Sequence, residues 1–360
     1  MSVVEKDART RILGLSSDEL SAALVPLLEE MGEHPYRARQ IRDWLYARTP
    51  ASFEGMSDLP RRVREALAAR FVLHPVSRKA EQVSADGTRK YLWALEDGGH
   101  LESVSIPEPE RTTYCISTQA GCPVKCTFCA TGFGGFRGQI DAAEIVDQVL
   151  AMRSAGRPPT NIVYMGMGEP LLNWKPVARS LEILTSPEQI AFGARRITLS
   201  TVGIPEKIRE LGREFPQVKL ALSLHAPRND LREEIIPLNR QFPLEEVLDA
   251  VRDHVRATGK KATFEYIVLP GVNDSEADAT DLARLLDGVP SRINLIGFNP
   301  FPGADYEKPS VKRLLTFRRW LARSYPGDIT IRRSRGEDIQ GACGQLSLLH
   351  AGAPETPFHP

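Results

Sequence analysis

Residues 112–132 read TTYCISTQAGCPVKCTFCATG and contain four of the five cysteines of the chain. The first seven letters are typical of a buried β-strand, and Cys122, Cys126 and Cys129 follow it at the spacing CxxxCxxC. In a (β/α) barrel the catalytic loops follow the carboxyl ends of the strands. The stretch therefore predicts the first strand of such a barrel and, directly after it, a loop whose thiols belong to the site.

Downstream of this stretch, apolar runs typical of strands alternate with amphipathic runs typical of helices. Asp141 and Glu144 match a capping box at the start of one helix, and Pro243 and Gly259 lie at the two ends of another. Repeated strand–helix units with nearly continuous apolar strands indicate a parallel sheet. Six units are fewer than the eight of a full barrel, so we predict an α/β fold with a partial (β/α)6 barrel. A doubly wound sheet is the alternative.

The chain divides into four expected regions. Residues 1–76 contain amphipathic runs such as SSDELSAALVPLLEEMG and predict a helical accessory domain. Residues 77–110 carry two alternating runs around the turn signal EDGG and predict a β-hairpin linker region. We place the partial barrel at residues 111–348 and a disordered, proline-rich tail at residues 349–360.

Composition narrows the class of protein. The chain is 42% hydrophobic and 26% charged, which is ordinary for a globular protein. We find no apolar segment of the roughly 20 residues that a membrane helix needs and no signal-peptide core at the start, so we expect a cytoplasmic protein without membrane contact. An odd number of clustered cysteines in a long chain favours metal binding or catalysis over a disulfide framework.

The three thiols of CxxxCxxC admit two interpretations. A structural zinc site needs four ligands, usually in two short pairs, and the chain offers no second pair. Thiolates also hold iron–sulfur clusters, and three of them leave one iron of a [4Fe–4S] cubane open to a small molecule. We therefore predict that Cys122, Cys126 and Cys129 hold a [4Fe–4S] cluster, with zinc as the alternative.

Short polar groups follow several of the other expected strands. Glu169, in MGMGEP, can accept a hydrogen bond from an ammonium group, although a tight turn with a solvated carboxylate is the alternative. Ser200, Ser223, His225 and Asn299 follow further strands and would face the same end of the sheet. A packed or capping role is the alternative for His225.

Two cysteines remain outside the motif. Cys115 lies within the first expected strand, and Cys343 lies in GEDIQGACGQL, a polar, glycine-containing segment after the last one. A lone cysteine is usually a small core residue. The setting of Cys343 is instead that of a loop able to reach a pocket, so two spare thiols suggest sulfur chemistry in the reaction.

The chain resembles a known family nearly end to end. CxxxCxxC in a first strand–helix loop is similar to the radical S-adenosylmethionine (SAM) superfamily. The combination with further segments resembles the bacterial adenine-C2 RNA methyltransferases, which act on both 23S rRNA and tRNA. These segments are YRARQIRDWLY, LESVSIPE, RTTYCISTQAGCPVKCTFCATG, MGMGEPLLN, SLHAPRNDLREEIIPLN, INLIGFNPFPGA and RGEDIQGACGQL.

The resemblance implies specific roles. Cys343 would carry the methyl group as S-methylcysteine, Cys115 would resolve the RNA adduct through a transient disulfide with Cys343, and Glu102 would accept a proton. It implies one [4Fe–4S] cluster, two SAM molecules per turnover, an electron donor such as flavodoxin or ferredoxin, and a monomer. The SAM-binding residues carried over are Gly168, Glu169, Ser200, Ser223, Leu224, His225 and Asn299.

Charge distribution bears on RNA contact. Net charge is zero, yet residues 308–335 hold nine Lys or Arg and one acid, and residues 61–70 hold four Arg and one Glu. Such clusters are phosphate contacts in RNA-binding proteins, which would make the N-terminal helical domain an RNA-contacting one. A solvated helix face is the alternative.

Three alternatives to adenine-C2 methylation remain from sequence. One is the sister group that methylates adenine C8 of rRNA, and the proline after Glu169 and the NPFPG segment resemble the C2 group instead. Another is a radical SAM enzyme with a protein or small-molecule substrate. The third is a zinc-stabilised RNA-binding module without chemistry.

Overall fold

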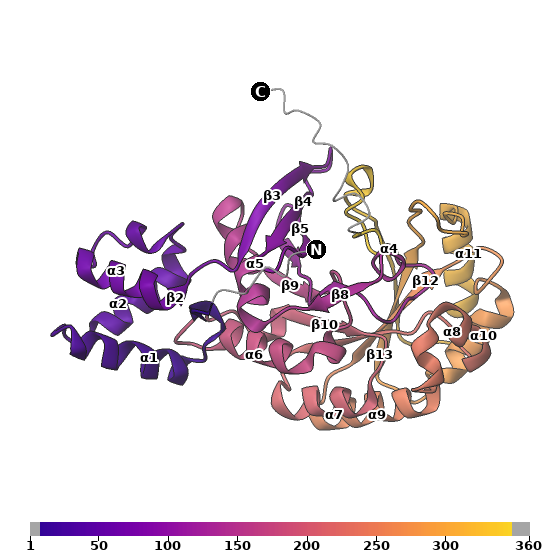
Figure 1. The fold of residues 1–360 in the computed structure, drawn as a ribbon. Helices are drawn as coiled ribbons and strands as arrows, with labels where there is room; N and C mark the ends of the chain where they lie inside the picture. The colour runs from indigo at the N-terminus through magenta and orange to yellow at the C-terminus, as the bar shows by residue number, and fades with distance from the viewer. Residues whose placement is uncertain (1–7, 348–360) are drawn as a thin grey trace.

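A single ten-stranded sheet organises the computed structural model, which describes residues 8–347 (Figure 1). Its strand order is β14-β13-β12-β11-β10-β9-β6-β5-β4-β3. From β6 to β14 all neighbours are parallel, and each strand lies beside the next one of the series along the chain. A doubly wound sheet would reverse its strand order at a switch point. The predicted α/β class with a partial barrel is confirmed, and the doubly wound alternative is wrong.

The seven parallel strands lie where the sequence has apolar runs typical of strands. Helices follow the first six of them, which gives six strand–helix units and a final strand. The strands are β6 (Thr112–Cys115), β9 (Asn161–Tyr164), β10 (Ile197–Thr201), β11 (Lys219–Ser223), β12 (Ala262–Val268), β13 (Ser291–Gly297) and β14 (Asp328–Arg332).

The barrel helices begin and end largely where their capping signals stand. Asp141 and Glu144 form the predicted capping box, and Gly259 ends its helix in the left-handed conformation with a φ of 67°. Pro243 is the N-cap residue, one position before the first turn. The helices are α5 (Ala142–Ala155), α6 (Trp174–Thr185), α7 (Pro205–Glu214), α8 (Asn229–Ile235), α9 (Leu244–Thr258), α10 (Glu276–Leu285) and α11 (Val311–Leu321).

The two faces of strand β12 differ in what their side chains contact. Phe264, Tyr266 and Val268 are fully buried, and the Tyr266 ring stacks on Phe317 of α11 with centroids 5.3 Å apart. Because side chains alternate along a strand, Glu265 lies on the opposite, inner face. The outer face therefore builds the core against the helices, and the inner face is left for the site.

The N-terminal region forms its own apolar cluster and packs on the barrel. Ser16 caps α1 in a capping box with Glu19, and Pro26 lies inside that helix. The cluster extends to Val146 and Leu150 of α5, so the helices rest on one flank of the barrel (Figure 1). The elements are β1 (Thr10–Arg11), η1 (Ile12–Gly14), α1 (Ser17–Glu30), α2 (Arg37–Asp43), η2 (Trp44–Arg48), η3 (Phe53–Gly55), α3 (Arg61–Arg70) and β2 (Phe71–Val72).

Three antiparallel strands extend the sheet beyond the barrel. The expected hairpin is formed by β4 and β5, and β5 pairs with β6, so the sheet runs without a break across residue 110. Strand β3 was not anticipated. A second small hairpin frames the cysteine motif. These elements are β3 (Val76–Val83), β4 (Arg89–Leu95), β5 (His100–Pro107), β7 (Gln119–Gly121), α4 (Ala130–Phe133) and β8 (Phe136–Gln139).

The region boundaries at residues 76 and 110 stay predictions. The expected disordered tail at residues 349–360 lies outside the described residues. Within residues 8–347, no helix combines the length and the apolar character required to cross a membrane.

Candidate active site at the carboxyl ends of the barrel strands

The cysteine motif follows a strand of a small hairpin in which one position has no room for a side chain. Strand β7 pairs with β8, and Cys122 directly follows β7. Gly121 has a φ of 84°, and a Cβ there would lie 1.9 Å from the carbonyl oxygen of Gly135. Only glycine fits this position. The hairpin thereby fixes where the loop of three cysteines leaves the sheet.

The three cysteines share a cavity of about 160 Å³ with the carboxyl ends of the barrel strands. This motif cavity also contains Phe128, which packs edge-on against His225 with ring centroids 4.7 Å apart. Five of the residues carried over as SAM ligands line it: Gly168, Glu169, Ser200, Ser223 and His225.

The thiols of the motif cavity suit a positively charged iron centre. All are free, and burial raises the pKa of Cys122 to about 12 and that of Cys126 well above its ordinary value. A metal centre reverses that preference, because a coordinating thiol is deprotonated. Among the described residues, no three His, Cys, Asp or Glu side chains converge on a single ion. Three thiolates leave one iron of a [4Fe–4S] cubane open to a small molecule, so the three cysteines of the motif cavity fit such a cluster.

The Glu169 carboxylate is held by hydrogen bonds from residues at and after the ends of β9 and β10. Its Oε1 accepts hydrogen bonds from the Thr201 hydroxyl at 2.7 Å and the Leu171 amide at 3.0 Å, and its Oε2 accepts one from the Val202 amide at 2.9 Å. Burial raises the pKa of Glu169, and these donors together with Arg232 oppose the shift. A carboxylate has about four acceptor positions, so one remains for a donor in the cavity.

His225 is a neutral hydrogen-bond donor in this structure. Its Nδ1 accepts a hydrogen bond from the Ile267 amide at 3.0 Å, so the ring proton lies on Nε2. Burial and the positive charge of Arg232 lower its pKa to about 3. His225 also has a φ of 61°, in the left-handed region. It therefore acts at neutral pH as a fixed donor and not as an acid or base.

Arg232 lies close enough to Cys126 and Glu169 for their charges to affect its pKa, and sequence reasoning missed it. Its guanidinium is 1% exposed and donates to the carbonyl oxygens of Leu224 at 3.0 Å and Ser223 at 3.1 Å. It also donates to the Val202 carbonyl. Arg232 thus ties the end of β10 to the end of β11. Leu224 is fully buried, and its amide donates to the Glu265 carbonyl at 3.1 Å.

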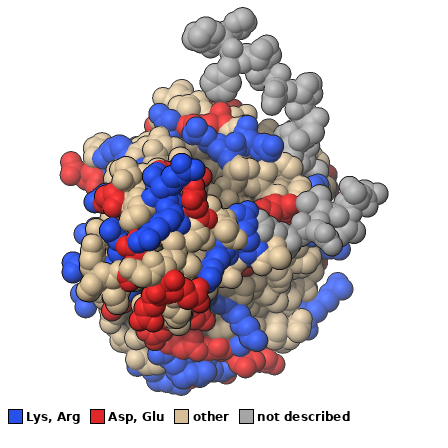
Figure 2. Space-filling view, turned by 60° about the vertical axis from the view of Figure 1, so that its left-hand side comes forward, with Lys and Arg blue, Asp and Glu red and all other residues tan. Residues whose placement is uncertain are grey.

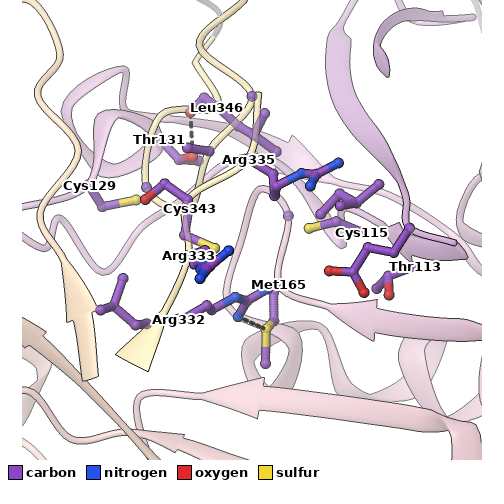
Figure 3. A pocket seen from close by; sticks show the side chains of 18 of the residues that line it. Thr113, Cys115, Cys129, Thr131, Met165, Arg332, Arg333, Arg335, Cys343 and Leu346 are labelled. Atoms are coloured by element: carbon purple, nitrogen blue, oxygen red, sulfur yellow. Dashed lines mark hydrogen bonds between the residues drawn. The ribbon is translucent and has the colours of Figure 1, made fainter. Parts of the chain in front are cut away.

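A larger cavity of about 470 Å³ adjoins the first one and contains both spare cysteines (Figure 3). In this thiol cavity Cys115 comes from β6 and Cys343 from the loop after β14. Burial, followed by the nearby Cys343, raises the pKa of Cys115 to about 12. Cys129 and Cys343 line both cavities, so the motif and the two spare thiols belong to one site.

Asn299 orients the Cys343 loop and lines neither cavity. Its Nδ2 donates to the Cys343 carbonyl at 3.1 Å, and its Oδ1 accepts from the Ser334 hydroxyl at 2.7 Å. The amide of Ala130 donates to the carbonyl of Gly344 at 2.8 Å. The loop is thereby fixed both to the motif helix α4 and to the end of β13.

Arg332 is a second charged residue that sequence reasoning missed. It lines both cavities, and its Nη1 lies 3.5 Å from the sulfur of Met165. The negative charges that Cys343, Glu265 and Cys115 can carry raise its pKa, against the effect of burial. Arg332 ends the last barrel strand. The search for polar residues at the ends of strands, which selected Ser200, would therefore have found it.

Glu102 lies on the same sheet face as Cys115 but lines neither cavity. Cys115 pairs with Val104, and residues two apart share a face. The Glu102 carboxylate is 5% exposed, lies 3.1 Å from the ammonium of Lys90 and accepts a hydrogen bond from the Ser347 amide at 2.9 Å. In this structure the C-terminal segment therefore lies against it.

The two clusters of basic residues differ in whether their side chains have partners. All four arginines of residues 61–70 are bound to acidic side chains or a carbonyl oxygen. In residues 308–335, four exposed cations have no partner in the described part of the chain: Lys312, Arg318, Arg319 and Arg333. Figure 2 shows Lys and Arg mixed with Asp and Glu over the face that brings the N-terminal helices forward.

Comparisons with known proteins agree with these features. Residues 116–283 match the radical SAM superfamily, and residues 10–73 match the ribosomal RNA large subunit methyltransferase N-terminal domain. The chain is 46% identical to a probable dual-specificity RNA methyltransferase RlmN of Thermotoga neapolitana, over 94% of this chain and 97% of that protein. It is 43% identical to the dual-specificity RNA methyltransferase RlmN of an Anaeromyxobacter species, over 93% and 90%.

A solved structure gives the same result. The crystal structure of a radical SAM methyltransferase from Sphaerobacter thermophilus superimposes with a TM-score of 0.89 at 45% identity. It covers 94% of this chain, and this chain covers 99% of it. The similarity therefore extends over the N-terminal helices, the antiparallel strands and the barrel together.

Proposed function

This chain belongs to the RlmN family of radical SAM RNA methyltransferases, and we propose that it methylates C2 of an adenine in 23S rRNA and in tRNA. The observation that carries the proposal is the shared thiol cavity of Cys115 and Cys343 beside the motif cavity. Adenine C2 lies between two ring nitrogens and is not a nucleophile, so direct displacement on a SAM methyl group cannot reach it. Two further thiols supply another route.

The motif cavity is the proposed cofactor site. Cys122, Cys126 and Cys129 would hold the cluster, and Glu169, His225 and the strand-end serines would surround SAM. When bound, the cluster supplies the reductive cleavage of SAM to a 5′-deoxyadenosyl radical. The protein contributes a cavity in which the donors around the cofactor are fixed before it binds.

Cys343 is the proposed carrier of the methyl group. Its thiolate takes the methyl of one SAM and leaves S-adenosylhomocysteine. The 5′-deoxyadenosyl radical would take one hydrogen atom from that methyl group, and the carbon radical left on Cys343 would add to adenine C2. The adduct would then give one electron back to the oxidised cluster, so that the C2 hydrogen can leave as a proton. Arg332 lies beside Cys343 and Cys115, and its positive charge opposes the rise that burial causes in the pKa of Cys115. The position of Cys343 at the junction of both cavities supports both contacts.

Cys115 is the proposed resolving thiol. Its thiolate attacks the sulfur of Cys343, so an S–S bond forms while the bond from that sulfur to the transferred carbon breaks. The bonding pair stays with the carbon, which takes up a proton and becomes the methyl group. A dithiol reductant then returns both cysteines to thiols. Their common cavity supports this step.

Glu102 is the proposed acceptor of the C2 proton. It shares the sheet face of Cys115 and is buried 3.1 Å from the ammonium group of Lys90. The Ser347 amide now donates to the Glu102 carboxylate, so the C-terminal segment must shift before RNA can reach it.

Arginines line the thiol cavity and suit entry of a nucleotide. Arg111, Arg333 and Arg335 lie around it, and Arg333 has no partner among the described residues. An adenine must leave its stack to reach a buried thiol, and unpaired loops release a base at the lowest cost. We also propose a cytoplasmic monomer, two SAM molecules per turnover, and flavodoxin or ferredoxin as electron donor.

Mass spectrometry of RNA nucleosides tests the function. Cluster-loaded protein, SAM and a reductant should produce 2-methyladenosine in a 23S rRNA fragment and in tRNA, and Cys343→Ala should produce none. Formation of 8-methyladenosine would assign the chain to the C8 reaction instead. Reductive SAM cleavage with no RNA modification in either substrate would contradict an RNA substrate.

A further inference from the structure

The loop that carries Cys343 contacts a turn from the opposite end of the sheet. Residues 333–343 follow β14, which lies at one end of the ten-stranded sheet, and the turn of residues 84–88 joins β3 to β4 at the other end. The thiol cavity is lined from both sides, by Ile106 of β5 and by Arg335 of the loop. Because Arg335 also contacts the turn, the turn and the loop meet at the edge of this cavity.

The contact is reciprocal, because each segment supplies one carboxylate to the other. Asp338 of the loop accepts hydrogen bonds from the Ser84 hydroxyl at 2.6 Å and from the Ala85 amide at 3.1 Å. Asp86 of the turn accepts one from the Gly336 amide at 3.1 Å. We call these two carboxylates, together with the groups that donate to them, the clasp. Hydrogen bonds to a charged acceptor are among the stronger ones in proteins, so the clasp is a firm connection.

The two oxygens of the Asp86 carboxylate have separate tasks. Its Oδ1 stays within the turn and accepts from the Thr88 amide at 2.9 Å. Its Oδ2 faces the loop, where it accepts from Gly336 and lies 3.0 Å from Nε of Arg335. Gly336 has a φ of 65°, and a Cβ there would lie 2.8 Å from the Thr88 methyl group. The turn and the loop are therefore in close contact at this point, with no room for a side chain on Gly336.

The clasp fixes the segment of the loop that precedes Cys343. The Gly341 amide donates to the Gly336 carbonyl at 2.8 Å, so residues 336–341 close on themselves directly after the clasp. Cys343 follows two residues later, and Asn299 holds its carbonyl oxygen from the barrel side. The position of the thiol is therefore limited by the turn on one side and by the barrel on the other.

We propose that the clasp holds Cys343 within reach of Cys115, and that Asp86 and Asp338 are positioning residues for the resolving step. The roles of the two thiols rest on the proposed function. Both thiols line the thiol cavity, at whose edge the clasp lies. A loop released from the turn would let the Cys343 thiol take up more positions, which would lower its effective concentration at Cys115.

The disulfide equilibrium between Cys115 and Cys343 tests this role without SAM or RNA. Cluster-loaded protein is equilibrated anaerobically with mixtures of reduced and oxidised glutathione, in which the oxidised form takes up the two electrons of the thiols. Mass spectrometry of alkylated peptides then gives the equilibrium constant. Asp86→Asn keeps an oxygen for Thr88 but places an NH₂ group against the loop. It should lower the constant by about 10-fold, as expected for the loss of hydrogen bonds to a charged group.

A second variant and a matched control complete the experiment. Asp338→Asn breaks the clasp from the loop side and should lower the constant by a similar factor. Asp97→Asn alters the corresponding Asp–Gly turn between β4 and β5, where the carboxylate accepts from the Gly99 amide of its own turn at 2.9 Å. This control should keep the natural constant, because a general loss of turn stability does not change the distance between the two thiols.

Three results would overturn the inference. One is a natural constant in Asp86→Asn and Asp338→Asn, and another is an equal loss in Asp97→Asn. The third is a natural protein in which no Cys115–Cys343 disulfide forms, since Cys343 would then not be held within reach of Cys115. Absence of 2-methyladenosine from the RNA assay would count against the proposed function alone, because this equilibrium requires neither SAM nor RNA.

Discussion

Cys115 and Cys343 are separated by more than 200 residues of sequence, and the barrel brings them into one cavity. The roles that we propose for them differ because their surroundings differ. Cys115 lies in a strand, where burial raises its pKa to about 12. Cys343 lies in a loop that Asn299 holds at the junction of both cavities. The strand thiol suits a late attack on a nearby sulfur, and the loop thiol suits contact with both cofactor and RNA.

Replacement of the strand thiol should separate formation of the adduct from its release. In Cys115→Ala, Cys343 can still bond to adenine through its methyl carbon, but no thiol remains to attack the bridging sulfur. RNA should therefore stay covalently attached to Cys343 under denaturing conditions, as mass spectrometry of nuclease-treated peptides would show. A Cys115→Ala protein free of RNA that makes 2-methyladenosine at the natural rate would refute the resolving role.

His225 should make stability depend on pH in the acidic range. Its folded pKa of about 3 lies below the ordinary value of 6.5, so the unfolded chain binds a proton that the folded chain does not. The contribution to stability is complete above pH 6.5 and falls by about 1.4 kcal/mol per pH unit as the pH drops toward 3.

Urea unfolding at pH 7 and pH 5 measures that contribution. His225→Gln should flatten the pH dependence of the free energy of unfolding, by about 2 kcal/mol over this interval. The exposed His34→Gln is the control and should keep the natural slope. An unchanged slope in His225→Gln would mean that His225 is not buried as a neutral ring.

At the scale of elements, the sequence predicts those parts whose signals are local. Seven apolar segments mark the barrel strands, and the capping box of Asp141 and Glu144 marks the start of α5, because the residues that define these features are neighbours in sequence. Strand β3 was missed because its side chains are mostly exposed, so no apolar alternation marks it. Helix α1 formed as predicted although it contains Pro26, because the packing of the helix outweighs the local cost of a proline.

Side-chain environments were harder to foresee than elements. The search for polar residues at the ends of strands selected Glu169, Ser200 and Ser223, which line one cavity in the structure. Arg232 and Glu265 escaped it. Arg232 is buried on a helix by acceptors from two strand ends, and the Oε2 of Glu265 is buried without a hydrogen-bond partner among residues 8–347. Such facts depend on three-dimensional neighbours and have no signature in a single sequence.

The β7–β8 hairpin should control assembly of the cluster site. In Gly121→Ala the new Cβ would clash with the Gly135 carbonyl, so the hairpin must shift and carry Cys122 with it. We expect the reconstituted variant to hold less iron and to show weaker iron–sulfur absorbance. Gly138→Ala, in β8, meets no atom within 4 Å and should reconstitute normally. Equal iron content in both variants would show that the hairpin does not position the motif.

At the scale of the whole molecule, a net charge of zero conceals an uneven distribution of unpaired cations. The arginines of α3 are neutralised within the N-terminal region, as Arg61 is by Glu65 at 2.7 Å. Among the described residues, free cations remain on α11, at Lys312, Arg318 and Arg319, and Arg333 after β14 lines the thiol cavity. We therefore expect the unpaired Arg333 at the thiol cavity to attract RNA phosphates more strongly than the paired arginines of α3.

The contrast between Arg333 and Arg61 tests that distribution. Arg333 lines the thiol cavity without a partner in the described residues, so Arg333→Ala should remove one phosphate contact. Filter binding of tRNA across a series of salt concentrations should then show weaker affinity and a slope of log K against log salt that is smaller by about one. Arg61→Ala removes a cation already paired with Glu65 and should leave that slope nearly unchanged. If Arg61→Ala reduced the slope and Arg333→Ala did not, RNA would approach through the N-terminal helices, and the arginines of the thiol cavity would have to act on the base or the cofactor instead.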